Sequence, residues 1–132
     1  MIFADSSFWI GLRRTADAHH EQAGLLLERY GEEQLITSNH IRGETWTFLR
    51  RRVGHRSALD FLDQVARSQR LEVAFVGEEL EREALDWLRA RDERPYSFVD
   101  ATSFALMRAR GIERALAFDG DFAAAGFVEL RP

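Results

Sequence analysis

Short apolar segments alternate along the chain with longer segments of helical periodicity. The apolar segments are continuous runs and occupy residues 2–4, 35–37, 71–75, 115–118 and 127–130. Continuous apolar runs are typical of strands that are covered on both faces, as in a parallel α/β sheet. We therefore predict a central parallel sheet of about five strands, flanked by helices.

Apolar residues between these runs recur three and four positions apart, which is the spacing of one helix face. This pattern covers residues 23–30, 58–65 and 80–88, and we also predict helices from about His40 to Val53 and from Phe98 to Arg110. Strands that alternate with helices predict right-handed crossovers and a doubly wound sheet of the α/β class. In such sheets, ligands bind at the carboxyl ends of the strands.

Two serines mark expected helix starts. Ser57 and Ser97 each precede an aspartate by three positions, Asp60 and Asp100, in the pattern of a capping box. Gly111 is the expected end of the helix that starts after Ser97, because glycine readily adopts the left-handed conformation that terminates many helices.

Length and composition indicate one globular domain, residues 1–132. The chain has no visible linker or repeat, and its hydrophobic content of 45% with 30% charged residues is typical of folded proteins. Without cysteine it can form neither disulfides nor thiolate metal sites. No apolar run approaches the roughly 18 residues of a membrane span, and the N-terminus lacks a secretory signal pattern, so we expect no membrane contact and a cytoplasmic location.

All 18 basic residues are arginine. The absence of lysine excludes P-loop nucleotide binding, Schiff-base catalysis and the receiver domains of response regulators. The net charge of −4 argues against broad electrostatic attachment to nucleic acid, although it allows a local basic patch. Any polyanion must therefore be bound by arginine, by metal, or by both.

Two aspartates directly follow predicted strands. Asp5 follows the first strand, in FADSSFW, and Asp119 follows the fourth, in LAFDGDF. Both are therefore expected at the carboxyl edge of the sheet. Each also has an ordinary alternative role as a helix N-cap, because an aspartate before a helix accepts hydrogen bonds from free backbone N–H groups.

Glu44 is expected on a helix, three residues after Ile41 and four before Phe48. This spacing predicts that Glu44 shares their apolar face. A buried carboxylate needs a cation. Either a bound metal or a nearby arginine, such as Arg42 or Arg51, would supply one.

Asp100 lies in the first turn of a strongly apolar helix, in SFVDATSFALM, where a capping role is the alternative to a site role. Together with the other three, it gives four carboxylates that independent elements place near one edge. Their mutual repulsion would raise their pKa values unless a divalent cation is bound. Oxygen ligands without sulfur favour Mg²⁺ or Mn²⁺.

These segments resemble the PIN domain, and especially the VapC-type toxins of bacterial toxin–antitoxin pairs. The resemblance covers nearly the whole chain and lies in four acidic motifs that occur in the family's order. They are DSSFW, TSNHIRGETWTFL, SFVDATSFALMRARGI and LAFDGDF.

The resemblance implies a metal-dependent endoribonuclease with a single PIN domain. By motif, the catalytic and metal-binding residues are Asp5, Glu44, Asp100 and Asp119. Asp121 is an additional acidic neighbour, and Ser7 is a candidate for hydrogen bonding in the substrate site. The resemblance further implies an RNA substrate, a homodimer, and a cognate VapB-type antitoxin that obstructs the active site.

We interpret the acidic set as a holder of one or two divalent ions that activate water for in-line hydrolysis of RNA. Arg13 and Arg14 follow the first short helix and are expected near the mouth of the active site. They are candidate phosphate contacts. For most of the arginines at 50–52 and 56 we favour a solvated helix end. Two other functions stay open: an RNA-processing PIN nuclease without antitoxin, and a non-catalytic binding module whose acids serve only as caps.

Overall fold

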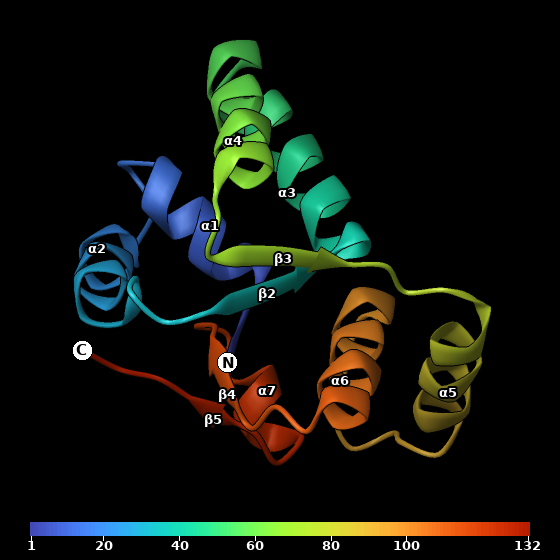
Figure 1. Cartoon of the computed structure of the whole chain (residues 1–132). Coiled ribbons are helices and arrows are strands. Elements are labelled where there is room, and N and C mark those ends of the chain that lie inside the picture. The colour runs from blue at the N-terminus through green and yellow to red at the C-terminus, as the bar shows by residue number, and fades with distance from the viewer.

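Five parallel strands form the centre of the computed structural model, which describes residues 1–132 (Figure 1). The strands are β1 (Ile2–Ala4), β2 (Leu35–Ser38), β3 (Leu71–Ala74), β4 (Arg114–Leu116) and β5 (Val128–Glu129). The predicted parallel sheet is confirmed, with strand ends displaced by at most two residues. The strand order in the sheet is β3-β2-β1-β4-β5.

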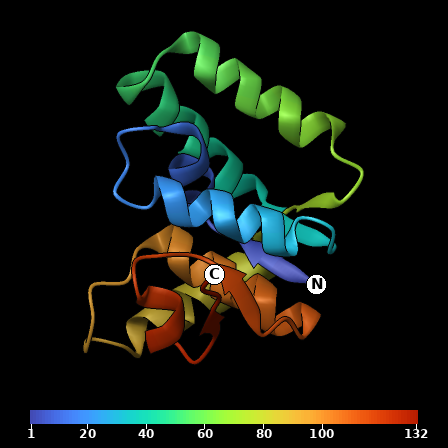
Figure 2. The same cartoon turned by 90° about the vertical axis from the view of Figure 1, so that its left-hand side faces the viewer.

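Seven helices surround the sheet. They are α1 (Ser6–Arg13), α2 (His20–Tyr30), α3 (Asn39–Arg52), α4 (His55–Arg67), α5 (Glu78–Arg89), α6 (Phe98–Arg110) and α7 (Asp121–Ala124). Helices α1, α3 and α4 lie on one side of the sheet and α5, α6 and α7 on the other, with α2 packed beside α1 (Figures 1 and 2). None of these helices combines the length and the apolar character that crossing a membrane requires.

The two predicted capping boxes had different outcomes. The box of Ser97 and Asp100 is confirmed, and α6 ends at Gly111 in the left-handed conformation, with φ of 65°. The box at Ser57 is wrong. Helix α4 follows α3 almost directly and begins at His55 after the turn at Gly54, so Ser57 lies inside the helix and caps nothing.

Phenylalanine rings pack α6 and α7 against the strands of the sheet. Phe104 of α6 packs edge-on against Phe122 of α7 with ring centroids 5.0 Å apart, and Phe122 contacts Phe3 of β1 at 5.8 Å. All three rings are fully buried. Burial of each such side chain contributes about 1.5–3 kcal/mol, so this stack fixes the positions of α6 and α7 relative to the sheet.

The strand order reverses between β1 and β4. From β1 the chain moves outward to β2 and β3, and it then crosses back to β4 and β5 on the other side of β1. Such a reversal opens a crevice beyond the carboxyl ends of the two flanking strands. The residues that follow Ala4 and Leu116, which are paired neighbours across β1 and β4, therefore lie at this crevice.

Candidate active site

Asp5 stands at the carboxyl end of β1, and its backbone N–H donates to the Leu116 carbonyl at 3.0 Å. The residue is only 3% exposed. Its carboxylate accepts hydrogen bonds from the Ser7 backbone N–H at 3.2 Å and from the Ser7 hydroxyl at 2.7 Å. Asp5 is thus the N-cap of α1, as its alternative role predicts, and it also lies at the crevice.

Burial raises the pKa of Asp5 to about 7, despite the hydrogen bonds from Ser7 that favour the charged form. The negative charges of Asp119 and Asp100 raise the pKa further, although they contribute less than burial. These electrostatic contributions indicate that the three carboxylates lie close enough to repel one another, as the sequence predicts.

Asp100 reaches the same crevice from the first turn of α6. It is buried, and its carboxylate accepts the Ser97 backbone N–H at 3.0 Å while the Ser97 hydroxyl accepts the Asp100 backbone N–H at 2.9 Å. Burial raises the pKa of Asp100 to about 6, and the charges of Asp121 and Asp119 add to this rise. Here too the capping role and a place at the crevice coexist.

Asp119 lies on the loop between β4 and α7, and Asp121 is the first residue of α7. One carboxylate oxygen from each of them and one from Asp100 lie within 4.8 Å of one another. Although Asp119 is exposed overall, neighbouring protein partly desolvates its carboxylate and raises its pKa, and the charge of Asp121 raises it further.

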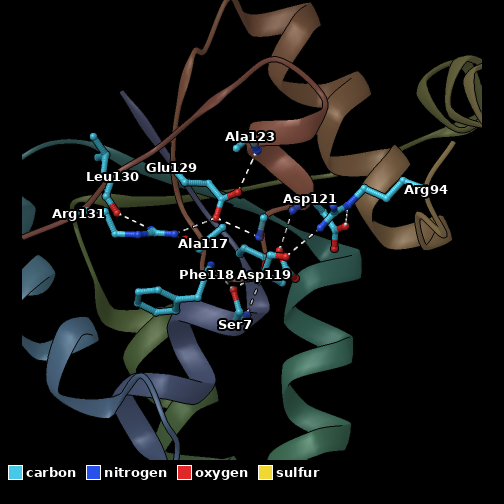
Figure 3. Close-up of polar contacts among 12 residues, drawn as sticks. Ser7, Arg94, Ala117, Phe118, Asp119, Asp121, Ala123, Glu129, Leu130 and Arg131 are labelled. Carbon is cyan, nitrogen blue, oxygen red and sulfur yellow. Dashed lines mark hydrogen bonds and ion pairs between the residues drawn. The ribbon is translucent and has the colours of Figure 1, made fainter.

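Arg94 partly neutralises this cluster. Its guanidinium pairs with the Asp121 carboxylate at 2.6 Å and donates to the Asp119 carbonyl at 3.1 Å, which links the α5–α6 loop to the β4–α7 loop. Figure 3 shows Asp121 between Asp119 and Arg94. Arg94 also lies against Gly120, where an added Cβ would come within 3.2 Å of the guanidinium.

Glu129 holds the same loop from β5. Its carboxylate, on a side chain only 4% exposed, accepts the backbone N–H groups of Gly120 at 3.3 Å and Ala123 at 2.9 Å and pairs with Arg131 at 3.2 Å (Figure 3). It thereby caps α7, which has no capping side chain at its own N-cap, Gly120.

Sequence reasoning missed both Arg94 and Glu129. Glu129 had a signal, because it is a charged residue within an otherwise apolar run from Phe127 to Leu130. The sequence carries no signal for Arg94. Nothing in the segment before Ser97 distinguishes this arginine from the other arginines of the chain.

The prediction that Glu44 shares the apolar face of its helix is wrong. The buried stripe of α3 runs through Ile41, Thr45 and Leu49 in steps of four. Glu44 is therefore about 100° from the centre of this stripe, and it is exposed. It makes no ion pair with Arg42, Arg51 or any other residue, and it lines a groove on the outer side of α3 that Val99, the neighbour of Asp100, also borders.

The structure separates the two arginines predicted at the mouth. Arg13 ends α1, about 12 Å along the helix from Asp5, and its guanidinium donates to Gln64 at 2.5 Å and to the Asp60 carbonyl at 3.3 Å, both on α4. The prediction of Arg13 near the mouth is therefore wrong, because α1 runs away from the strand edge. Arg14 lies over the ring of Phe48 on α3, 6.0 Å from its centroid.

The donor set fits a hard divalent cation. Mg²⁺ and Mn²⁺ prefer carboxylate and water oxygens, and here the carboxylates of Asp100, Asp119 and Asp121 converge, with Asp5 nearby, without any sulfur or imidazole ligand. Burial is the main cause of the raised pKa values of Asp5, Asp100 and Asp119, and their mutual repulsion adds to it; a cation between them would favour their charged forms and offset both. Of the predicted acids, the structure brings together Asp5, Asp100, Asp119 and Asp121, and it leaves Glu44 on the adjacent groove.

Comparison with known proteins gives consistent results. Residues 2–128 match the PIN domain family. The chain is 52% identical over 132 residues to the 23S rRNA-specific endonuclease VapC20 of Mycobacterium tuberculosis, in strains CDC 1551 and H37Rv, with 100% of this chain and 99% of that protein covered. It also matches a crystal structure of M. tuberculosis VapC20, a sarcin-ricin loop cleaving toxin, with a TM-score of 0.95 and 51% identity over the full length of both chains.

Proposed function

Because this chain belongs to the PIN domain family, we propose that it is a Mg²⁺- or Mn²⁺-dependent endoribonuclease and the toxin of a VapBC-type toxin–antitoxin pair. The observation that carries the proposal is the cluster of the Asp100, Asp119 and Asp121 carboxylates within 4.8 Å of one another at the crevice, with Asp5 close enough to be repelled by Asp119 and Asp100. The similarity to VapC20 over the whole chain supports it.

In this proposal Asp5, Asp100 and Asp119 hold the cation, and Asp121 is a fourth carboxylate that Arg94 partly neutralises. A divalent ion in such a site lowers the pKa of the attacking water and offsets charge on the phosphodiester. Ser7 orients the Asp5 carboxylate through its two hydrogen bonds. Glu44 remains a proposed catalytic residue, acting from the exposed face of α3.

For the substrate, we propose the sarcin-ricin loop of 23S rRNA, which the names of the M. tuberculosis relative and of its crystal structure give as that protein's target. The place of action is then the cytoplasm, where ribosomes are. We further propose a homodimer and a VapB-type antitoxin partner, on the basis of the family resemblance.

A cleavage assay on ribosomes tests the nuclease proposal. Wild-type protein with Mg²⁺ or Mn²⁺ should cut 23S rRNA once and leave a 5′-phosphate and a 3′-hydroxyl, and EDTA should abolish the cut. Asp5→Asn and Asp100→Asn should each lower the rate by more than about 100-fold while the protein stays folded by circular dichroism. Asp63→Asn, which changes an exposed aspartate on α4, is the matched control and should be fully active.

Undiminished cleavage by folded Asp5→Asn protein would defeat the metal-site proposal. A 2′,3′-cyclic phosphate product would instead reject attack by water, because that product requires the ribose hydroxyl as nucleophile.

Expression in a bacterial host tests the toxin role. The wild type should arrest growth, Asp5→Asn should not, and coexpression of a short neighbouring reading frame should relieve the arrest. A chain that cuts RNA without arresting growth would favour the RNA-processing alternative. Light scattering on the purified protein determines whether it forms the proposed dimer.

A further inference from the structure

A groove of about 660 Å³ runs along the outer face of α3. Eight of its nine lining residues belong to this helix, and the ninth is Val99 of α6. Its lining combines acidic, aromatic and basic side chains, among them Glu44, Phe48, Arg51 and Arg52.

One end of the groove adjoins the acidic crevice. Val99 directly precedes Asp100, and the ring of His40, which also lines the groove, packs edge-on against Phe98 with centroids 5.5 Å apart. From His40 the helix carries the groove to Arg51, about 16 Å away at 1.5 Å per residue. The groove thus begins beside the residue that precedes Asp100 and leads away from it along α3.

The far end of the groove carries two arginines, Arg51 and Arg52, that form no ion pair. None of the eight ion pairs in the molecule involves Arg51 or Arg52, although the neighbouring Arg56 pairs with Asp60. The guanidinium group of an unpaired arginine can bind a phosphate through two parallel hydrogen bonds.

An aromatic ring lies between these arginines and the acidic end. Phe48 lines the groove, and the guanidinium groups of Arg52 and Arg14 lie 5.8 Å and 6.0 Å from its ring centroid. Aromatic rings beside cations are the surfaces on which unpaired nucleobases stack in proteins that bind single strands, and a base on Phe48 would take the place of one of these guanidinium groups.

We propose that the α3 groove binds the part of the RNA that extends from the cleavage site, with phosphates on Arg51 and Arg52 and a base on Phe48. The inference rests on the proposed nuclease function. It assigns substrate binding to Arg51 and Arg52, for which the sequence favours only a solvated helix end.

Binding measurements with a sarcin-ricin loop RNA hairpin in EDTA test the groove separately from cleavage. Arg51→Gln/Arg52→Gln should weaken binding at least tenfold at low salt, and the slope of log affinity against log salt should become shallower by about 1.5. The control is Arg50→Gln/Arg67→Gln, which removes the same charge from exposed arginines outside the groove. It should change binding by less than about twofold.

A pair of substitutions tests the aromatic contact. Phe48→Leu should weaken RNA binding about fivefold or more, whereas Phe48→Tyr should bind RNA as the wild type does. Tyrosine keeps a ring for stacking, and leucine keeps only apolar volume. Equal binding by both variants would remove base stacking from the proposal.

The remaining outcomes separate the two proposals. If wild-type protein neither binds Mn²⁺ in calorimetry nor cleaves RNA, the proposed function fails. If wild-type protein does both and the Arg51/Arg52 variant binds RNA like its control, only the groove proposal fails. The groove proposal is also overturned if the Arg51→Gln/Arg52→Gln variant still binds RNA but no longer captures the coexpressed antitoxin. The groove would then be a protein-binding site.

Discussion

The Ser7 hydroxyl accepts a hydrogen bond from the backbone N–H of Phe118 at 3.2 Å. The same hydroxyl donates to the Asp5 carboxylate at 2.7 Å. Ser7 therefore ties the segment that carries Asp5, after β1, to the segment that carries Asp119, after β4. This side-chain link adds to the backbone hydrogen bond between Asp5 and Leu116 across the crevice.

Ser7→Ala should loosen this connection. The variant leaves the Phe118 N–H without its partner and removes one hydrogen bond from Asp5, which should lower the free energy of unfolding by about 1–2 kcal/mol. Mn²⁺ affinity should fall about tenfold, since a ligand-orienting contact is lost. Thermal denaturation and calorimetry measure both. Ser6→Ala, at a neighbouring serine without a side-chain hydrogen bond, is the control, and an equal loss in both variants would contradict a specific role for Ser7.

The raised pKa values make the metal-free protein sensitive to pH. The folded protein retains the protons of Asp5 up to a pKa of about 7 and of Asp100 up to about 6, whereas the unfolded chain releases them near the ordinary value of 3.8. The folded state thus binds more protons in this window, so stability should fall as the pH rises from about 4 through 7. We expect a loss on the order of 2–4 kcal/mol, measured by urea denaturation in EDTA.

Two additions to that experiment identify the cause. Asp5→Asn keeps an equally good N-cap and removes the larger of the two titrations, so it should flatten the pH dependence and stabilise the metal-free protein at pH 8. Mn²⁺ should raise the melting temperature of the wild type more at pH 8 than at pH 5.5. A stability that is constant from pH 5 to 8 in EDTA would show that these carboxylates are not desolvated as described.

Glu129→Ala should weaken metal binding without touching a proposed ligand. The substitution releases the N–H groups of Gly120 and Ala123, which loosens the β4–α7 loop that carries Asp119 and the start of α7 that carries Asp121. It also removes a negative charge near the site, so both effects lower Mn²⁺ affinity, by about tenfold or more.

Glu129→Gln separates the two effects, because it removes the charge and keeps one oxygen acceptor. Its Mn²⁺ affinity should lie between those of the wild type and Glu129→Ala. Glu113→Ala, at an exposed glutamate without side-chain hydrogen bonds, should bind Mn²⁺ as the wild type does. If Glu129→Ala matches this control, the loop does not depend on Glu129.

Arg94→Gln should have the opposite effect on metal binding. Its guanidinium neutralises Asp121 at 2.6 Å, so its removal leaves the carboxylates more repulsive in the metal-free protein. Because the pair is partly exposed, the stability of the protein should change little, and Mn²⁺ affinity should rise about threefold. Arg89→Gln, which breaks the exposed pair with Asp86, is the control. A fall in Mn²⁺ affinity would instead make Arg94 a residue that positions the loop.

The local pattern of the sequence determined the elements of this protein. Continuous apolar runs predicted the parallel sheet, because only strands covered on both faces are apolar throughout. Ser97, Asp100 and Gly111 fixed the bounds of α6, since caps act through residues within one turn of the helix end. The positions of Asp5 and Asp119 after strands predicted the edge at which they lie.

The tertiary structure decided what those local signals leave open. It placed β1 beside β4, which turns separate strand ends into one crevice, and it brought Arg94 from the α5–α6 loop and Glu129 from β5 to the segment between β4 and α7. It also rotated Glu44 out of the buried stripe of α3, because the face that a helix buries depends on the partners packed against it. Sequence spacing fixes angles within one helix or strand, whereas contacts between elements depend on how the whole chain packs.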